Sequence, residues 1–251
     1  MTEFAIETIA LSKAFGIPHE QRTTFKEYFL HPFRRVTFER NQALRDVSVS
    51  VERGEFFGVI GPNGSGKSTF LKVIAGIYRG DSGTVRVSGR ISTFIELGVG
   101  FHPDLNARDN VRIAGTLLGL TSTELNAKFD DIIAFGELGR FVDQKLKNYS
   151  SGMLARLAYS IAIQVPFDIL LLDEVLAVGD EAFQQKCFTT FDRFRAEGKT
   201  IVYVSHDLGT IERFCDRVLL LEHGRAKRIG SAPEIVDDYR QREGVTTAAA
   251  G

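Results

Sequence analysis

The sequence lacks long apolar runs and has almost no net charge. Its 251 residues carry a formal net charge of −1, which gives no electrostatic basis for binding nucleic acid. No apolar stretch approaches the roughly 20 residues that a helix needs to cross a bilayer. The longest candidate, residues 161–178, is interrupted by Pro166, Asp168, Asp173 and Glu174. Any role at a membrane is therefore expected to depend on a partner rather than on a span of the chain itself.

Cysteine is also scarce. Cys187 and Cys215 are far apart and fit neither a metal-binding nor a redox spacing, so a reducing compartment is expected. The first residues, Met1 to Phe4, lack the basic-then-apolar pattern of a secretory signal. With 43% apolar and 25% charged residues, the composition is that of an ordinary globular protein. The length suits one large α/β domain, and no internal repeat is visible.

Strand-like and helix-like segments alternate after residue 45, which predicts a mostly parallel sheet with helices on its faces. Residues 108–139 carry helical spacing without strand signals, so a helical insertion is expected there. The predicted strands are Phe4–Ala10, Val47–Val51, Phe56–Ile60, Thr84–Val87, Ile91–Ile95, Ile169–Leu172, Thr200–Val204 and Val218–Leu221.

Two segments stand outside this alternation. Between residues 18 and 41, the stretch Phe25–Leu30 has the pattern of a short amphipathic helix and is followed by Phe33, Arg34 and Arg35. Two interpretations remain open for it, a solvated surface insertion or an element that docks onto a partner or a membrane surface. Residues 244–251 are small and polar, which predicts a disordered tail.

The most specific motif is a glycine-rich loop between a predicted strand and a predicted helix. The pattern G-x-x-x-x-G-K-[ST] of a phosphate-binding loop is matched at every fixed position by Gly61, Pro62, Asn63, Gly64, Ser65, Gly66, Lys67 and Ser68, and Thr69 continues into the helix. Glycines let backbone N–H groups turn toward phosphate oxygens, and the helix N-terminus adds partial positive charge. We expect Lys67 to reach the β- and γ-phosphates and Ser68 to place its hydroxyl on Mg²⁺.

An acidic pair closes the predicted strand at Ile169–Leu172. Asp173 would come to the Mg²⁺ site beside the phosphate loop, and Glu174, just beyond the strand, would polarise an attacking water. Acidic residues at a strand end are common, so the assignment depends on the phosphate loop about 100 residues earlier.

Two further segments are ambiguous by themselves. Ser150, Ser151 and Gly152 precede a predicted helix, where they would form either an anion site or a plain helix cap. His206 follows the strand Thr200–Val204, on the edge where open α/β sheets bind ligands. It would either contact the γ-phosphate or serve as a structural histidine.

Taken in order along residues 43–240, these features resemble the nucleotide-binding ATPase of ABC transporters. The resemblance implies an α/β P-loop NTPase fold with a mostly parallel core sheet, an antiparallel β subdomain and a helical subdomain. The domain would fill residues 1–241, with the helical subdomain at about 102–165, the insertion at about 18–41 and a disordered tail at 242–251. It also implies ATP and Mg²⁺ as cofactors.

The same resemblance assigns residue roles. Asp173 would support the metal, Glu174 would be the catalytic carboxylate and His206 a switch that reports the γ-phosphate. Residues 177–180 would cross the interface between two copies of the chain. Ser150, Ser151 and Gly152 would contact the γ-phosphate held by the other copy.

Departures from the family pattern point to a subfamily. Ser151 and Met153 replace a glycine and a glutamine of the usual signature, Val175 replaces a proline, and Glu96 stands where a glutamine usually touches Mg²⁺ and the membrane partner. These segments, together with residues 89–105, closely resemble the ATPases that export O-antigen, capsule or teichoic acid polymers. Some of those carry a C-terminal carbohydrate-binding domain, and because this chain ends soon after Tyr239, none is expected here.

The adenine contact is left open. An aromatic ring upstream of the phosphate loop usually stacks on the base, and both Phe15 and Phe38 qualify. Either ring could equally belong to the core.

The resulting hypothesis is a pair of identical chains that hold two ATP molecules between them and drive two membrane-spanning permease subunits from the cytoplasmic face of the cytoplasmic membrane. The alternatives are a soluble ABC ATPase of repair or translation and a regulatory ATP-binding module. Residues 108–139 are too short for the coiled coil of repair members, the chain holds one ATPase set where translation members hold two, and the presence of Glu174 and His206 argues against a purely regulatory module.

Overall fold

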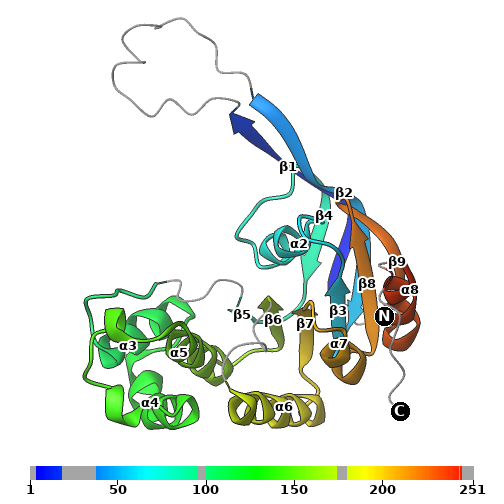
Figure 1. Ribbon diagram of the computed structural model, residues 1–251. Coiled ribbons are helices and arrows are strands. Elements are labelled where there is room, and N and C mark those ends of the chain that lie inside the picture. The colour runs from blue at the N-terminus through cyan, green and yellow to red at the C-terminus, as the bar shows by residue number, and fades with distance from the viewer. Residues whose placement is uncertain (1–3, 19–37, 95–99, 174–179, 243, 245–251) are drawn as a thin grey trace, which may run out of the picture.

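The core of the protein is a six-stranded sheet, shown in Figure 1 by a computed structural model that describes residues 4–18, 38–94, 100–173, 180–242 and 244. The strand order is β5-β6-β7-β3-β8-β9. The first five strands in this order are parallel, and β9 is antiparallel at one edge. They span β5 Ile91–Phe94, β6 Ile169–Asp173, β7 Thr200–Val204, β3 Phe56–Ile60, β8 Arg217–Glu222 and β9 Arg225–Ser231.

A second, three-stranded antiparallel sheet lies beside the first, in the order β2-β1-β4. Its strands are β1 Phe4–Pro18, β2 Phe38–Glu52 and β4 Ser82–Val87. The expected combination of a mostly parallel core sheet with a separate antiparallel sheet is therefore confirmed.

Helices cover the core sheet and form a separate group. Figure 1 shows α3, α4 and α5 packed together at one side of the molecule, in green. Two short 3₁₀ turns, Gly139–Phe141 and Leu146–Asn148, lie between α4 and α5. The helices are α2 Lys67–Ile74, α3 Ala107–Leu117, α4 Ser122–Gly136, α5 Ser151–Gln164, α6 Glu181–Ala196, α7 Leu208–Phe214 and α8 Ala232–Arg242. In the described part of the chain, no helix is long and apolar enough to cross a membrane.

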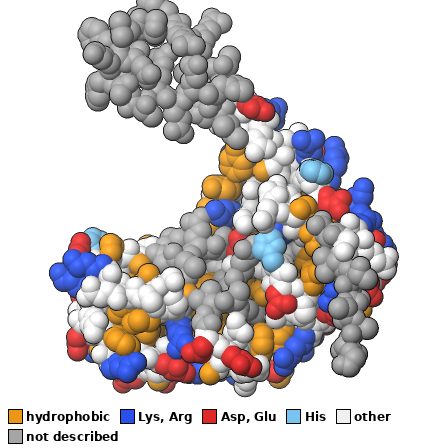
Figure 2. All heavy atoms as spheres, viewed as in Figure 1, with side chains coloured by type: hydrophobic (Ala, Val, Ile, Leu, Met, Phe, Trp, Pro, Cys, Tyr) orange, Lys and Arg blue, Asp and Glu red, His pale blue; other side chains and the backbone are white. Residues whose placement is uncertain are grey.

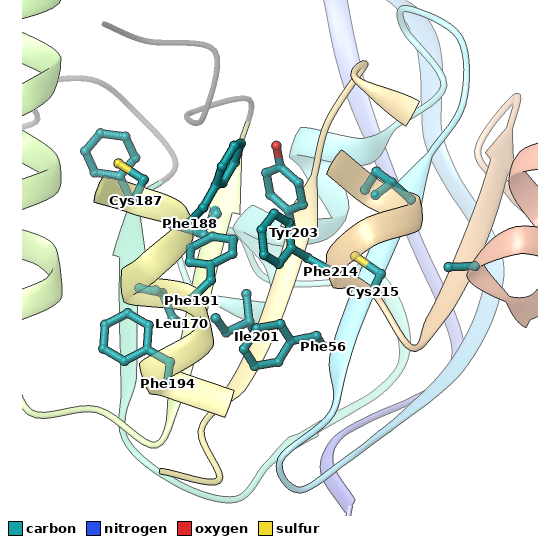
Figure 3. Close-up of a cluster of buried hydrophobic side chains, with 14 of the residues drawn as sticks. Phe56, Leu170, Cys187, Phe188, Phe191, Phe194, Ile201, Tyr203, Phe214 and Cys215 are labelled. Carbon is teal, nitrogen blue, oxygen red and sulfur yellow. The ribbon is translucent and has the colours of Figure 1, made fainter. Parts of the chain in front are cut away.

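The central strands of the core sheet are buried on both faces. Successive side chains of a strand point to opposite faces, so each strand contributes to two apolar clusters. In β6, Leu170 and Leu172 join one apolar cluster, whereas Ile169 and Leu171 join another. The first cluster packs against α6 and α7 and is rich in aromatic rings, as Figure 3 shows. The second packs against α2 and the antiparallel sheet. A third cluster fills the helical group α3–α5.

Both thiols lie within or beside the aromatic cluster. Cys187 of α6 and Cys215, just after α7, are unpaired and buried. Removal from water raises the pKa of the Cys187 thiol to about 12 and also raises the pKa of Cys215. Neither thiol therefore becomes a thiolate near neutral pH.

The structure extends the predicted strands in two places. β1 and β2 continue as a paired arm to Pro18 and from Phe38, so the ends of the predicted insertion at 18–41 belong to strands. Register shifts near Leu11 and Lys13 interrupt the two-residue alternation that a sequence pattern needs. β9 was not predicted, because this edge strand exposes alternate residues such as Arg225 and Lys227 and has no apolar run.

The face seen in Figure 2 carries mixed charge. Acidic and basic side chains alternate along the lower part of the view, over α4 and α6. Such intermixing agrees with the net charge of −1.

Candidate nucleotide site

Strand register brings three of the predicted motifs to one edge of the core sheet. Asp173 at the end of β6 pairs with Val204 of β7, and Val204 pairs with Val59 of β3. The glycine-rich loop starts two residues after Val59, and His206 lies two residues after Val204. Because parallel strands end at the same edge, these groups lie close together where open α/β sheets bind ligands.

One side of the glycine-rich loop is packed tightly against backbone atoms of β2 and β8. Gly61 and Gly66 have φ angles of +144° and +107°, and a Cβ at either position would lie 2.0 Å from the Leu221 carbonyl oxygen or 2.4 Å from that of Ala43. A Cβ at Gly64 would meet no described atom within 4 Å. The loop is therefore wedged between β2 and β8 and open on the opposite side, where a phosphate would enter.

This packing gives a stability prediction. A Gly119→Ala change places alanine at a φ of +93° in open space and should cost about 1–3 kcal/mol of backbone strain. Gly61→Ala has comparable strain plus a backbone collision, so it should cost about 1–3 kcal/mol more. Urea unfolding followed by circular dichroism measures both. Equal losses for the two variants would show that the loop can move away from β8.

Two polar side chains of the loop are buried. Lys67 is 5% exposed, and its Nζ donates to the carbonyl oxygens of Gly61 at 2.8 Å and Pro62 at 3.0 Å. The Ser65 hydroxyl is buried and has no hydrogen-bond partner among the described residues. Buried hydroxyls rarely stay unpaired, so the loop fits an incoming ligand rich in oxygen acceptors. Helix α2 has no acidic residue in its first turn, which leaves its positive end for an anion.

The metal candidates are described only in part. Ser68 is exposed at the start of α2, and Asp173 is half-buried at the end of β6. A hydroxyl, one carboxylate and substrate phosphates form a donor set that Mg²⁺ accepts, so these two residues fit that ion. Glu96, Glu174 and residues 177–179 lie outside the described residues.

His206 stands on a rigid turn. The Ser205 hydroxyl accepts from the Asp207 backbone N–H at 3.0 Å, and the Asp207 carboxylate caps α7 by accepting from the Gly209 and Thr210 backbone N–H groups. These bonds hold the turn while His206 itself remains exposed. The histidine therefore lies at the ligand edge of the sheet and outside the packed core.

The Ser150 segment is not brought to this edge. Ser150 caps α5, with its Oγ accepting from the Met153 backbone N–H at 3.2 Å, as the simpler interpretation requires. Its own O–H hydrogen is still available to donate. Helix α5 packs on α3, α4 and β5, whereas α2 packs on β2, β4, β6 and β7, and Figure 1 shows the two helices in different parts of the molecule. One chain therefore does not place Ser150 beside its own glycine-rich loop.

One of the two aromatic candidates has a described side chain. Phe15 is half-buried and meets Tyr78 edge-on, with ring centroids 5.3 Å apart, and Lys13 Nζ lies 5.4 Å from the Phe15 centroid. Tyr78 follows α2 and was missed by sequence reasoning, since no local pattern links it to Phe15. Phe38 begins β2, but its side chain lies outside the description.

A cavity of about 340 Å³ opens beside the Ser150 segment. The loop that forms one wall is tied to the chain just before Ser150 by two backbone bonds, from Leu146 N–H to the Leu105 oxygen and from Lys147 N–H to the Pro103 oxygen. Apolar and aromatic side chains predominate in its lining, which consists of Phe101, Pro103, Leu146, Lys147, Tyr149, Ser151 and Leu154.

Comparisons with known proteins identify the family of this chain. The family model described as ABC transporter matches residues 44–177. The O-antigen export system ATP-binding protein RfbB of Klebsiella pneumoniae is 43% identical over 234 residues, which cover 92% of this chain and 95% of that protein. The Myxococcus xanthus protein of the same name is 46% identical over 223 residues, but this chain spans only about half of its length (51%). The teichoic acids export ATP-binding protein TagH of Levilactobacillus brevis is 46% identical over 199 residues, which cover 79% of this chain and 55% of that protein.

Solved structures match the fold. A dimeric ATP-binding cassette in a post-hydrolysis state with ADP and Pi gives a TM-score of 0.74 at 22% identity, covering 90% of this chain and 98% of that one. An ATP-binding subunit of an ABC transporter gives 0.72 at 23% identity, covering 98% and 95%. At these identities the likeness concerns the fold alone.

Proposed function

This chain belongs to the ABC transporter family, as an ATP-binding ATPase subunit, and we propose that it powers export of a lipid-linked cell-surface polysaccharide across the cytoplasmic membrane. The observation that carries the proposal is the match over 95% of the length of a protein named for O-antigen export. The register that gathers the glycine-rich loop, Asp173 and His206 at one sheet edge supplies the matching chemistry.

ATP would bind with its phosphates on the open side of the glycine-rich loop. Lys67 would exchange its two carbonyl partners for phosphate oxygens, and the Ser65 hydroxyl would gain the acceptor it lacks. Ser68, Asp173 and Glu96 would hold Mg²⁺, which when bound supplies positive charge to the phosphate oxygens. Phe15 or Phe38 would stack on the adenine.

Hydrolysis would need two copies of the chain. Because Ser150 lies in the helical group and the phosphate loop in the sheet of the same chain, the second copy would supply the Ser150, Ser151 and Gly152 donors to the γ-phosphate. Glu174 would take a proton from the attacking water, and His206 would contact the γ-phosphate. Moving such a pair from 1:99 to 99:1 closed requires about 5.5 kcal/mol of differential binding, which charge-assisted contacts to two γ-phosphates are strong enough to supply.

The movement would pass to two membrane-spanning permease subunits bound near Glu96 and the helical group. The cavity beside Ser151 supports this placement, because its apolar wall and the Ser150 segment are joined by backbone hydrogen bonds. The chain would then sit as a peripheral subunit on the cytoplasmic side of the membrane.

Deletion in the cell of origin tests the proposal. Cells without the chain should lose the surface polysaccharide and accumulate its lipid-linked form inside, and the wild-type chain should restore the surface polymer. The chain should also copurify with a polytopic membrane protein. Loss of surface polymer without internal accumulation would place the chain in synthesis and contradict the proposal.

A further inference from the structure

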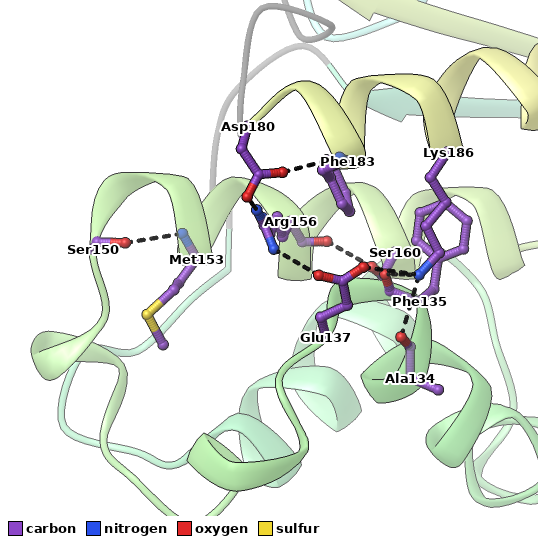
Figure 4. Close-up of polar contacts among 10 residues, drawn as sticks. All are labelled: Ala134, Phe135, Glu137, Ser150, Met153, Arg156, Ser160, Asp180, Phe183 and Lys186. Atoms are coloured by element: carbon purple, nitrogen blue, oxygen red, sulfur yellow. Dashed lines mark hydrogen bonds and ion pairs between the residues drawn. The ribbon is translucent and has the colours of Figure 1, made fainter.

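One guanidinium of the helical group contacts both the end of α4 and the start of α6. Arg156 lies in α5 and its side chain is 16% exposed. Its Nη1 donates to Glu137 Oε2 at 3.1 Å, and its Nη2 donates to Asp180 Oδ2 at 2.7 Å. Glu137 is the left-handed residue that ends α4, and Asp180 caps α6. A single side chain therefore joins the end of α4, the first turns of α5 and the start of α6, as Figure 4 shows.

Further contacts strengthen this junction. The Arg156 guanidinium stacks over the Phe183 ring at 4.9 Å. Lys186 of α6 donates to the Phe135 carbonyl oxygen at 2.8 Å, near the end of α4, where a cation is favoured. Tyr159, one turn further along α5, meets the Phe183 ring at 6.2 Å between centroids. The Tyr159–Phe183 ring contact thus lies beside the two ion pairs that Arg156 makes with Glu137 and Asp180. These two ion pairs, called the clasp below, are nearer to Ser150 along α5 than the ring contact is.

The position of Arg156 along α5 allows it to influence where Ser150 lies. At about 1.5 Å per residue, the six residue steps from Ser150 to Arg156 span about 9 Å of helix. A tilt of about 10° about Arg156 would move Ser150 by about 1.5 Å, and misplacing a group by about 1 Å can cost about a hundredfold in rate. Fixing α5 against α6 therefore sets where Ser150 is presented.

We propose that Arg156 is a positioning residue that holds Ser150 in the orientation needed to complete the ATP site of a second copy. The role rests on the proposed two-copy function. Arg156 acts through α5 and does not touch the nucleotide. Both carboxylates are required, because the planar guanidinium bonds to them with separate nitrogens.

The simpler alternative is that these ion pairs only stabilise the fold. The carboxylates of Glu137 and Asp180 are 52% and 66% exposed, and exposed ion pairs contribute little to stability. If the clasp only stabilised the fold, breaking it would lower the melting temperature and weaken ATP binding by the single chain. If the clasp positions Ser150, breaking it would instead lower the rate of ATP turnover and weaken dimer formation.

Three variants separate these readings. Asp180→Asn keeps the α6 cap, because asparagine caps as well as aspartate does, and removes the charge facing Arg156. Glu137→Gln removes the other charge, on a residue with no assigned contact to the second copy. Arg156→Gln removes both pairs. Glu7→Gln is the matched control, because it breaks the Glu7–Arg86 ion pair of 2.9 Å on the antiparallel sheet.

The expected result is a fall in kcat of about tenfold for Arg156→Gln and about threefold for each carboxylate variant. In a Glu174→Gln background, sedimentation should show the dimer dissociation constant rising in the same order. ATP affinity of the single chain should stay within about twofold and the melting temperature within about two degrees. Glu7→Gln should match wild type in every measurement.

Two results would overturn the inference. Unchanged kcat and pairing would show that α5 is held without Arg156, and losses that track melting temperature or single-chain ATP affinity would assign the clasp to stability alone. A Glu174→Gln chain with no other substitution that stays monomeric with ATP would overturn the two-copy function itself, and this inference with it.

Discussion

A Glu174→Gln variant is expected to bind ATP as tightly as wild type, to form a stable dimer with it, and to hydrolyse it about a thousandfold more slowly. The fall in rate would follow from loss of the proposed general base, since a general base contributes about 10²–10⁴-fold in enzymes. ATP affinity is kept because the neutral amide leaves the phosphate loop unchanged. The dimer would persist because the γ-phosphate proposed to bridge the two copies is not removed. Steady-state ATPase assays and sedimentation velocity with and without ATP measure these effects.

The matched control is Glu197→Gln. Glu197 is an exposed carboxylate at the far end of α6, so its loss should leave turnover and pairing unchanged. Near-normal hydrolysis by Glu174→Gln would remove Glu174 from the mechanism. A variant that remains monomeric with saturating ATP would contradict the shared site.

Loss of the Lys67 ammonium should weaken ATP binding about a hundredfold, the equivalent of about 2.8 kcal/mol. Hydrogen bonds to charged groups contribute about 1.5–3 kcal/mol each, and a bound triphosphate would accept more than one from Nζ. In Lys67→Ala the loop carbonyls of Gly61 and Pro62 also lose the donor that now satisfies them. Fluorescent-nucleotide titration gives the affinity.

Lys227→Ala is the control for charge, because it removes an exposed lysine from the edge strand β9. Circular dichroism should show that Lys67→Ala keeps its secondary structure, so that weak binding cannot come from unfolding. If a folded Lys67→Ala chain retains wild-type affinity, the assignment of residues 61–68 as the phosphate loop is wrong.

Much of the core sheet was predictable because its strands are short runs buried on both faces. Phe56–Ile60 and Thr200–Val204 were predicted with the bounds that the structure gives. The glycine-rich loop was predictable because its pattern and its strand–helix context are both local in sequence. β9 and the arms of β1 and β2 were not, because charged edge positions and register shifts remove the alternation on which a strand prediction depends.

The parts of the site that depend on distant contacts could not be predicted. Arg156 reads as an ordinary helical arginine, and its partners lie 19 and 24 residues away in sequence. Tyr78 acquires its relation to Phe15 only when α2 packs beside the antiparallel sheet. The roles of Glu96 and Glu174 remain predictions, since both lie outside the described residues.

Because both cysteines are buried, the native chain is suited to site-specific labelling at an introduced cysteine. Alkylating reagents attack thiolates at the surface, and Cys187 and Cys215 are enclosed by aromatic rings and aliphatic side chains. A cysteine introduced at an exposed position would therefore take up a maleimide dye or spin label without first deleting the natural ones. The slow labelling rate of the unaltered chain would then report how often its aromatic core opens transiently.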